Sequence, residues 1–401
     1  AKSSRRPMRQ KYLPVACSLL VKKWSPAFII SFGLAIKRAA PKPEHRVGMP
    51  AQLLFAVEKQ SRLKLSKLNL SLNRLWVFVV FTVILSSPSH AEWYSDTRSI
   101  MGTSFSVTLW HENPSQAEPL MAAAYAEMQR LDNLLSPWID TSEIARVNKL
   151  AAISAQPISD ELVGLVDKSL FFSRVSEGAF DITFASVGWY YDYREKVQPE
   201  EAKRQQLLPA INYRWLELNR EERTLLFKHK NVRIDLGGIA KGYAVDRVIA
   251  QLSAAGVKHA TVSAGGDSRV LGDKRGKPWM VGIKNPRDGG GTGNDTALVL
   301  PLENTAISTS GDYERYFVDP QSGERIHHIL NPKTGKSVRG VVSVTILGPT
   351  GSDTDPLSTT VFVLGVEKGL ALVNRLPGFD CVIIDAAGKV HYSDDLAPPE
   401  K

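Results

Sequence analysis

The chain has 401 residues, of which 43% are hydrophobic and 23% are charged, an ordinary composition for a globular protein. Its net charge of +9 arises in residues 1–91, which carry 16 Lys/Arg and 2 Asp/Glu, whereas residues 92–401 carry 34 Lys/Arg and 39 Asp/Glu. The larger part of the chain is therefore mildly acidic, and we expect no nucleic-acid partner. The two cysteines, Cys17 and Cys381, stand at opposite ends of the chain, and removal of an N-terminal leader would leave Cys381 unpaired, so we expect no disulfide framework.

Residues 1–91 contain the features of a signal peptide in their usual order. An apolar core of 11 residues at 75–85 follows Arg74, and a Ser-His-Ala sequence ending at Ala91 supplies a cleavage site. Because 11 residues are too few to cross a bilayer comfortably, a transmembrane helix is the less favoured alternative. Met49 is a candidate start of translation, with the residues before it as upstream translation. We predict a leader over 1–91, cleavage near Ala91 and a periplasmic protein, with attachment to the inner membrane left open.

The spacing of apolar residues predicts helices and strands in an irregular order. The expected helices lie at 117–135, 142–148, 159–176, 200–208, 243–255 and 352–374. The expected strands lie at 101–110, 215–218, 224–228, 233–236, 259–267, 280–284, 298–302, 305–310, 313–318, 341–347, 379–385 and 390–392, and another begins at Ile326. We expect a turn into an extended segment at 178–183, a surface insertion or lid at 189–211, and the Gly-rich tip of a hairpin at 289–294.

Strands interrupted by helices, without strict alternation, predict an α+β fold. No clear linker divides residues 92–401. We therefore expect one domain of mixed sheets with flanking helices over 92–401.

The stretch 235–246, Asp-Leu-Gly-Gly-Ile-Ala-Lys-Gly-Tyr-Ala-Val-Asp, joins an expected strand to an expected helix through a pair of glycines. Glycines let the backbone approach a ligand closely, and the free N–H groups at a helix N-terminus favour phosphate, so the stretch suits an anion. It matches neither the GxGxxG nor the GxxxxGK[ST] pattern, which argues against an ordinary dinucleotide fold or a P-loop. Taken alone, a packing or capping role for the glycines is an equally open alternative.

Three polar residues near the start of the last long helix share one helix face. Asp355, Ser358 and Thr359 are spaced i, i+3 and i+4. Oxygen ligands of this kind suit Mg²⁺, which keeps several waters and bridges to substrate phosphates. The alternative is a helix N-cap, a commoner use of Asp, Ser and Thr at a helix start. The sequence holds no HExxH or CxxC motif, so a zinc or iron site is not indicated.

Two adjacent histidines, His327 and His328, precede a Pro-Lys-Thr-Gly turn. Neighbouring residues of a strand point to opposite faces, so only one of the two can serve a given site. A structural imidazole is at least as probable an outcome for either of them. The GxSxG motif of serine hydrolases is absent, so serine-based hydrolysis has no support.

Seven motifs occur in a fixed order along the chain. They are MGTSFSV at 101–107, SEIARVN at 142–148, GAFDIT at 178–183, DLGGIAKGYAVD at 235–246, SAGGD at 263–267, HHILNPKTG at 327–335 and TDPLSTTVFVLG at 354–365. Together they cover nearly all of 92–401 and closely resemble the ApbE family of FAD:protein FMN transferases. The ordered set makes this resemblance far more specific than any single motif would.

The resemblance implies an enzyme that binds FAD and Mg²⁺, splits the pyrophosphate and attaches FMN through a phosphoester to a Ser or Thr hydroxyl of a target protein, releasing AMP. The implied targets are exported or membrane-anchored subunits of redox complexes, which agrees with the predicted signal peptide. Two alternatives stay open at this point. One is an FAD pyrophosphatase that uses the same site on water and yields FMN and AMP; the other is a periplasmic flavin-binding protein without catalysis.

The resemblance also implies roles for individual residues. His328 would be the base that takes the proton of the acceptor hydroxyl, for which an unperturbed pKa near 6.5 suits neutral pH. The side chains of Asp355 and Thr359 and the carbonyl of Gly238 would bind Mg²⁺. The residues that would line the FAD site are Met101, Trp138, Ala179, Phe180, Asp181, Asp235, Lys241, Ile329 and Ser358. Asn331 stands where the family usually has Asp; it keeps an acceptor oxygen but loses the charge.

Overall fold

The computed structural model describes residues 91–287 and 296–396. The predicted leader, apart from Ala91, and the predicted Gly-rich tip at 289–294 lie outside the described residues, so the leader and the domain boundaries stay predictions. Within the two described ranges, no helix has the length and apolar character that crossing a membrane requires.

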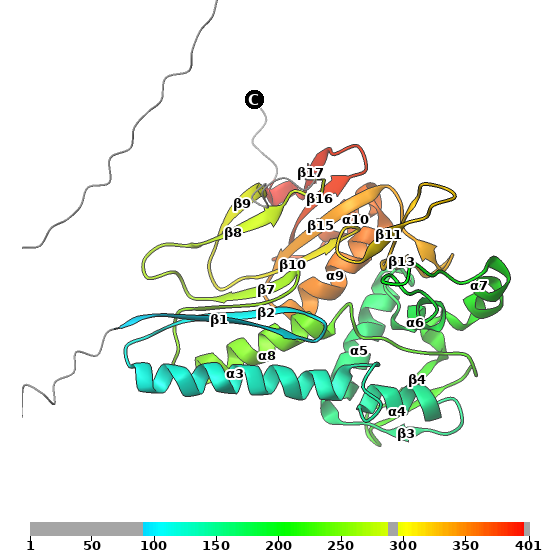
Figure 1. Ribbon diagram of the computed structural model, residues 1–401, viewed down its shortest axis with the longest axis horizontal. Coiled ribbons are helices and arrows are strands. Elements are labelled where there is room, and N and C mark those ends of the chain that lie inside the picture. The colour runs from blue at the N-terminus through cyan, green and yellow to red at the C-terminus, as the bar shows by residue number, and fades with distance from the viewer. Residues whose placement is uncertain (1–90, 288–295, 397–401) are drawn as a thin grey trace, which may run out of the picture. The chain divides into compact units, whose positions relative to one another are not determined.

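An antiparallel sheet of eight strands lies at the centre of the described part of the chain, in the order β1-β2-β6-β7-β10-β15-β16-β17 (Figure 1). Its strands are β1 (Glu92–Ile100), β2 (Thr103–His111), β6 (Ala260–Ala264), β7 (Asp267–Leu271), β10 (Ala306–Gly311), β15 (Val341–Gly348), β16 (Asp380–Asp385) and β17 (Val390–Tyr392). Strand β15 is buried along its whole length, which suits its run of β-branched residues.

A layer of helices covers one face of this sheet (Figure 1). It consists of α3 (Pro114–Leu135), α8 (Ala240–Ala254), α9 (Gly351–Leu364) and α10 (Val366–Val373). Helix α3 packs on β1 and β2, α8 on β6 and β7, α9 on β10 and β15, and α10 on β16, while each helix also packs on the next. Large side chains between the layers, such as Phe105, Met128 and Phe362, are fully buried, and each contributes roughly 1.5–3 kcal/mol. This core fixes α8 and α9 side by side.

The opposite face of the sheet carries a hairpin of β8 (Trp279–Lys284) and β9 (Thr296–Leu302). A small apolar cluster lies between them, in which Trp279 and Leu302 meet Val270, Ile307 and Leu347 of the sheet. Apolar side chains therefore bury both faces of the sheet in this region.

The remaining elements form a smaller lobe beside the helical layer (Figure 1). They are α4 (Glu143–Leu150), β3 (Gln156–Pro157), α5 (Asp160–Val175), α6 (Ala185–Gly188), α7 (Glu201–Leu207), β4 (Leu216–Asn219), β5 (Thr224–Phe227), β11 (Tyr316–Val318), β12 (Arg325–His327), β13 (Leu330–Asn331) and β14 (Lys336–Ser337). Side chains of the 189–211 segment, including Tyr191 and Leu207, pack on Leu330, and the Tyr191 hydroxyl donates to the Gly335 carbonyl. The predicted insertion therefore packs against the rest of the lobe.

Several predicted elements are wrong in detail. The segment 233–236 is extended but is no strand, because its backbone bonds go to the Asn148 side chain and to the Ile182 carbonyl. The 178–183 segment ends in a 3-10 turn, and its helix-like backbone replaces the expected extended segment. The expected helix at 243–255 begins earlier, at Ala240. The expected helix at 352–374 is two helices, because Gly365 has a φ of 81° that interrupts it.

Four strands were not predicted, of which β3 and β14 have two residues each and β1 and β7 are longer. Strand β1 pairs with β2 over nine residues, and β7 continues directly from the Gly-Gly-Asp turn that ends the predicted 259–267 strand. The α+β class with mixed helices and strands is confirmed by the structure.

Candidate active site

The crossing of α8 and α9 places the polar groups of the site. Gly242 and Gly351 stand where the two helix backbones meet, with no room for a side chain at either position. The carboxylate of Asp246 accepts the N–H groups of Gly351 and Ser352, both at 2.8 Å, and also the guanidinium of Arg269 at 2.6 Å. Asp246 thus supplies the N-terminal cap of α9 from the neighbouring helix.

A compact ion cluster lies beside this crossing. The Lys241 ammonium is 2.7 Å from Oδ2 of Asp267 and 3.5 Å from Oδ2 of Asp355, and the latter oxygen accepts the N–H of Gly242 at 3.0 Å. Burial and the neighbouring Asp267 raise the pKa of Asp355 to about 7. Burial alone would lower the pKa of Lys241, but the two carboxylates hold that pKa above its ordinary value. Two buried carboxylates at short range therefore share one lysine.

A row of hydroxyl groups follows Asp355 along α9. The Ser310 hydroxyl of β10 lies 2.8 Å from that of Ser358 and 3.3 Å from that of Thr359. Gly238 faces the same row, since a Cβ on it would lie 3.4 Å from Oγ1 of Thr359 and 3.2 Å from the Phe180 ring. Asp355 accepts from α8 and does not cap its own helix, so the capping alternative does not describe it. The described residues contain no group of three or more His, Cys, Asp or Glu side chains placed to bind a metal.

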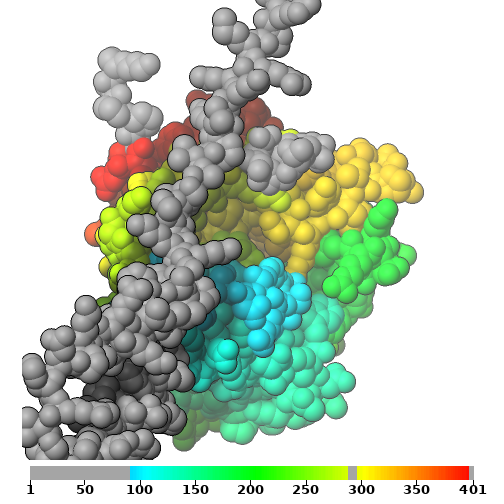
Figure 2. All heavy atoms as spheres, turned by 60° about the vertical axis from the view of Figure 1, so that its left-hand side comes forward, coloured from blue at the N-terminus to red at the C-terminus, as the bar shows by residue number. Residues whose placement is uncertain are grey.

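His328 lies near Arg315 and the turn between β1 and β2. The His328 N–H donates to the Arg315 carbonyl at 3.2 Å, and the Arg315 guanidinium lies 3.4 Å from the carbonyl of Gly102, next to Met101. Figure 2 shows the β1–β2 hairpin in cyan on the same side of the molecule as the yellow segment that contains Arg315. Met101 has a φ of 54°, and its N–H donates to Asp132. These contacts bring Met101 and His328 into one neighbourhood.

The two histidines differ as the strand alternation predicts. His327 is buried, with Nε2 2.8 Å from the Val338 carbonyl, so it is a structural imidazole. His328 has a buried Nδ1 without a hydrogen-bond partner among the described residues. Burial and the charges of Arg315, together with His327 and Lys241, lower the pKa of His328 to about 3. The expected ordinary pKa near 6.5 is therefore wrong, and His328 is neutral at pH 7.

Other predicted flavin-site residues hold the surrounding backbone. The buried Asp181 carboxylate accepts both the N–H and the hydroxyl of Thr183 and the N–H of Tyr213. Asp235 accepts the Gly237 N–H at 2.6 Å. Burial raises the pKa of Asp235, although the charges of Arg315 and Lys241 act to lower it. Asp181 thus holds the backbone at Thr183 and Tyr213 in place. Asp235 lies close enough to Arg315 and Lys241 for their positive charges to act on its carboxylate.

Trp138, unlike the buried residues of the site, lies at the surface. It is 67% exposed and stacks on Trp189 with ring centroids 4.4 Å apart, and the Arg233 guanidinium covers Trp189 at 4.1 Å. Its exposed indole face is free for another flat ring. Ile329 is buried beside His328, and Ala179 lines a groove next to the site.

Comparison with known proteins decides the family. The ApbE family model matches residues 101–383. The chain belongs to the ApbE family. An FAD:protein FMN transferase of Treponema pallidum is 30% identical over 318 residues, covering 75% of this chain and 86% of the relative. One from Klebsiella pneumoniae is 31% identical over 283 residues, covering 69% and 79%.

Solved ApbE-family structures have the same fold. The crystal structure of the ApbE protein of Thermotoga maritima has a TM-score of 0.68 and 32% identity, covering 76% of this chain and 98% of that one. The flavin transferase ApbE of Vibrio cholerae has a TM-score of 0.67 and 25% identity, with the same coverage. These likenesses confirm the α+β fold class that the order of expected strands and helices predicted.

The motifs of the ApbE family thus bring Gly238, Lys241, Asp355 and Thr359 together, although their roles stay predictions. Two residues of the site were missed. Asp267 ends the SAGGD motif. It follows a pair of glycines that resembles the Gly-Gly pair at 237–238, and this similarity could have indicated that Asp267 belongs to the site. Arg315 lies outside the seven motifs, so the sequence offered no signal for it.

Proposed function

We propose that this ApbE-family chain is an FAD:protein FMN transferase that uses Mg²⁺ and acts on a Ser or Thr hydroxyl. The hydroxyl oxygen attacks the phosphorus of the FMN half of FAD, forming a phosphoester. The bond from that phosphorus to the bridging oxygen breaks, AMP leaves with that oxygen, and the hydroxyl proton passes to a base. The names of the relatives, FAD:protein FMN transferases, support the donor, the transferred group and the protein acceptor.

The observation that carries the proposal is the pair of buried carboxylates, Asp267 and Asp355, held by one lysine. Burial, and after it the neighbouring Asp267, raises the pKa of Asp355, so a further cation beside this carboxylate would stabilise its charged form. The residues that the ApbE resemblance assigns to the metal offer oxygen donors: the Asp355 carboxylate, the Thr359 hydroxyl and the Gly238 carbonyl, and Gly238 lies next to Thr359. This donor chemistry fits Mg²⁺, which accepts few protein ligands and retains waters. When bound, Mg²⁺ would neutralise charge on the pyrophosphate.

Residues of the chain account for positioning and proton transfer. Lys241 and Arg315 both supply positive charge to the site, where phosphate oxygens would carry negative charge. Neutral His328 has one acceptor nitrogen, which could take the hydroxyl proton, and its Nδ1 has no hydrogen-bond partner among the described residues. Its lowered pKa makes it a weak base in the free protein, and an anionic substrate beside it would raise that pKa again.

We propose the periplasm as the location and an exported or membrane-anchored redox subunit as the acceptor. The support is the order of a basic residue, an apolar core at 75–85 and a small-residue site at Ala91. Sequencing the N-terminus of the protein from a periplasmic extract tests this location. A first residue near Glu92 is the expected result, and retention of the intact leader in the cytosol would contradict it.

Incubation of the purified protein with FAD, Mg²⁺ and a target that carries the acceptor hydroxyl tests the activity. We expect a covalent fluorescent band on the target and release of AMP. Free FMN without labelling would favour the FAD pyrophosphatase, and FAD that binds but is never consumed would favour the flavin-binding protein. His328→Ala should abolish transfer while FAD still binds, whereas full activity would remove His328 as the base.

A further inference from the structure

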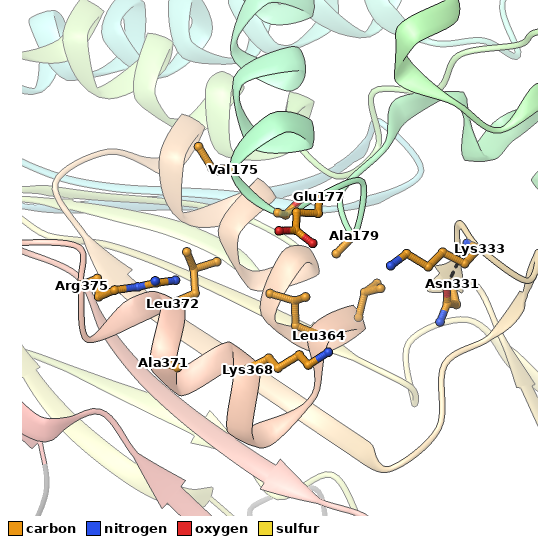
Figure 3. A pocket seen from close by; sticks show the side chains of 12 residues that line it. Val175, Glu177, Ala179, Asn331, Lys333, Leu364, Lys368, Ala371, Leu372 and Arg375 are labelled. Atoms are coloured by element: carbon orange, nitrogen blue, oxygen red, sulfur yellow. Dashed lines mark hydrogen bonds between the residues drawn. The ribbon is translucent and has the colours of Figure 1, made fainter.

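A groove next to the site shares Ala179 with the predicted flavin-site residues, and its other lining residues have no role in the proposed chemistry. It has a volume of about 470 Å³ and lies between the end of α5, the start of α10 and the turn after β13 (Figure 3). Its apolar lining includes Val175, Val363, Leu364 and Leu372. A volume of this size accommodates several side chains of a bound segment.

Three segments connect the lining of the groove to the candidate active site along the chain. Val363 follows Thr359 by one helical turn of α9, about 6 Å along the axis. Ala179 of the groove precedes Phe180, whose ring contacts Gly238. Asn331 lies three residues after His328. A chain whose hydroxyl reaches the site would therefore extend into the groove within a few residues.

The rim of the groove is basic and its charges are unpaired. Lys333, Lys368 and Arg375 line it together with a single acid, Glu177, and none of these four side chains forms an ion pair within the described ranges. In Figure 3 the ammonium groups of Lys333 and Lys368 point towards the groove from opposite sides. Exposed cations held apart in this way attract an acidic partner.

Apolar surface continues outside the groove on α5. Val175 is 45% exposed, and Phe171, one turn earlier on the same face, is 50% exposed. Large exposed apolar side chains next to a basic rim are typical of a surface that binds another protein.

We propose that this groove docks the acceptor protein, by holding a segment with acidic and apolar side chains beside the hydroxyl that receives FMN. This inference rests on the proposed transferase function and names the class of its protein substrate. The apolar side chains of the segment enter between Val175, Leu364 and Leu372. Its carboxylates pair with Lys333, Lys368 and Arg375. The groove thus selects the acceptor, and the ion cluster around Asp355 serves the flavin.

Two dye-labelled peptides of equal length test the proposal by fluorescence anisotropy. Each contains one Thr and the same leucines; one carries aspartates around them and the other carries lysines at those places. We expect the acidic peptide to bind at least about tenfold more tightly than the basic one and to lose affinity as salt rises. Equal affinities, or no binding of the acidic peptide, would overturn the proposal.

Charge reversal locates the binding. The double variant Lys368→Glu/Arg375→Glu should weaken binding of the acidic peptide about tenfold or more, and Lys333→Glu gives an independent second variant. The matched control is Lys277→Glu, an exposed unpaired lysine on the loop between β7 and β8, which should leave binding unchanged. Lys368→Arg keeps the positive charge and should bind the acidic peptide like the unaltered protein. Unchanged binding in both groove variants would overturn the proposal.

Measurements with FAD separate this inference from the proposed function. The groove variants should bind FAD like the unaltered protein and should show a raised KM for the acceptor with little change in kcat. Weaker FAD binding in them would overturn the docking role, because the groove would then belong to the flavin site. If the unaltered protein binds the acidic peptide but consumes no FAD, the proposed function fails while the groove stands.

Discussion

Gly242 of α8 and Gly351 of α9 touch backbone to backbone. A Cβ on Gly242 would lie 2.0 Å from the Gly351 carbonyl oxygen, and a Cβ on Gly351 would lie 2.4 Å from that of Gly242. The same approach lets the Gly242 N–H reach the Asp355 carboxylate at 3.0 Å. The glycine of the 235–246 motif therefore sets the spacing between Lys241 and Asp355, the two charges on which the site depends.

Gly242→Ala should destabilise the protein and impair the site together. Because the obstructing atom is backbone, the helices must move apart, which we expect to cost about 1–3 kcal/mol. The shift also lengthens the bond to Asp355, so FMN transfer should fall more than the loss of folded protein explains. Urea unfolding and the labelling assay measure the two effects.

Gly164→Ala is the matched control, because it makes the same change in a helix interior with open space around it. Apart from the neighbouring backbone of α5 itself, no atom of the described residues lies within 4 Å of a Cβ on Gly164. Alanine there should stabilise the protein by about 0.5–1 kcal/mol through its higher helix propensity. If both variants had the same stability, the close approach of α8 and α9 would not be the reason for Gly242.

Asp355→Ala should remove Mg²⁺-dependent turnover of FAD. The change deletes the carboxylate that the site offers to a cation, and we expect a loss of about 10²-fold or more. Titration of activity with Mg²⁺ measures it. Intact Mg²⁺-dependent turnover would show that the metal assignment is wrong.

Asp353→Asn is the control for that experiment, two residues earlier on the same helix. Asp353 pairs with Lys168 at 2.6 Å at a partly exposed position. Such a pair contributes less than about 1 kcal/mol, so turnover should stay near that of the unaltered protein.

The sequence predicted those helices and strands whose apolar residues repeat regularly at the helical or the strand period. The helix expected at 117–135 is α3, and the strand expected at 341–347 is β15, since both bury a continuous apolar surface. The segment 233–236 is also apolar, yet its backbone forms hydrogen bonds with a side chain and a loop carbonyl and not with another strand. A single sequence does not reveal whether an extended segment lies beside another strand.

The site could be predicted only where motifs contain it. Lys241 and Asp355 stand in two motifs that α8 and α9 bring together, so the resemblance was enough to name them. Asp267 joins them because β7 lies under α8, and Arg315 because its loop folds back towards Gly102. Those long-range placements, and the lowered pKa of His328 that follows from them, depend on the fold.

Asn148→Ala should destabilise the segment that leads to Asp235. The Asn148 side chain accepts the Ile234 N–H at 2.8 Å and donates to the Ile234 carbonyl at 2.9 Å. Alanine leaves both backbone groups without these bonds, which we expect to cost about 2 kcal/mol or more. Asn148→Asp keeps the acceptor oxygen but loses the donor, so its stability should lie between those of the unaltered protein and Asn148→Ala. Urea unfolding measures the series.

Asn133→Ala is the matched control for Asn148. Asn133 lies on the exposed side of α3, where its side chain accepts from the Gln129 side chain at 3.2 Å and forms no other side-chain bond to the described residues. Its loss should change stability by no more than about 0.5 kcal/mol. Equal effects at the two positions would contradict the role of Asn148 as a clamp.

His328 should make the stability of the protein depend on pH. Its pKa is about 3 in the folded protein and near 6.5 in the unfolded chain, so the unfolded state binds the proton first as pH falls. The contribution is fully present above about pH 6.5 and decreases by about 1.4 kcal/mol per pH unit below it, down to the folded pKa.

His328→Asn removes this titration and leaves His327 and the buried acids in place. Urea unfolding of both proteins at about pH 7.5 and about pH 4.5 should show the unaltered protein losing roughly 2–3 kcal/mol more than the variant between those conditions. The comparison isolates His328 because all other groups titrate in both proteins. Parallel losses would mean that the pKa of His328 is the same in the folded protein and the unfolded chain, and that burial does not lower it.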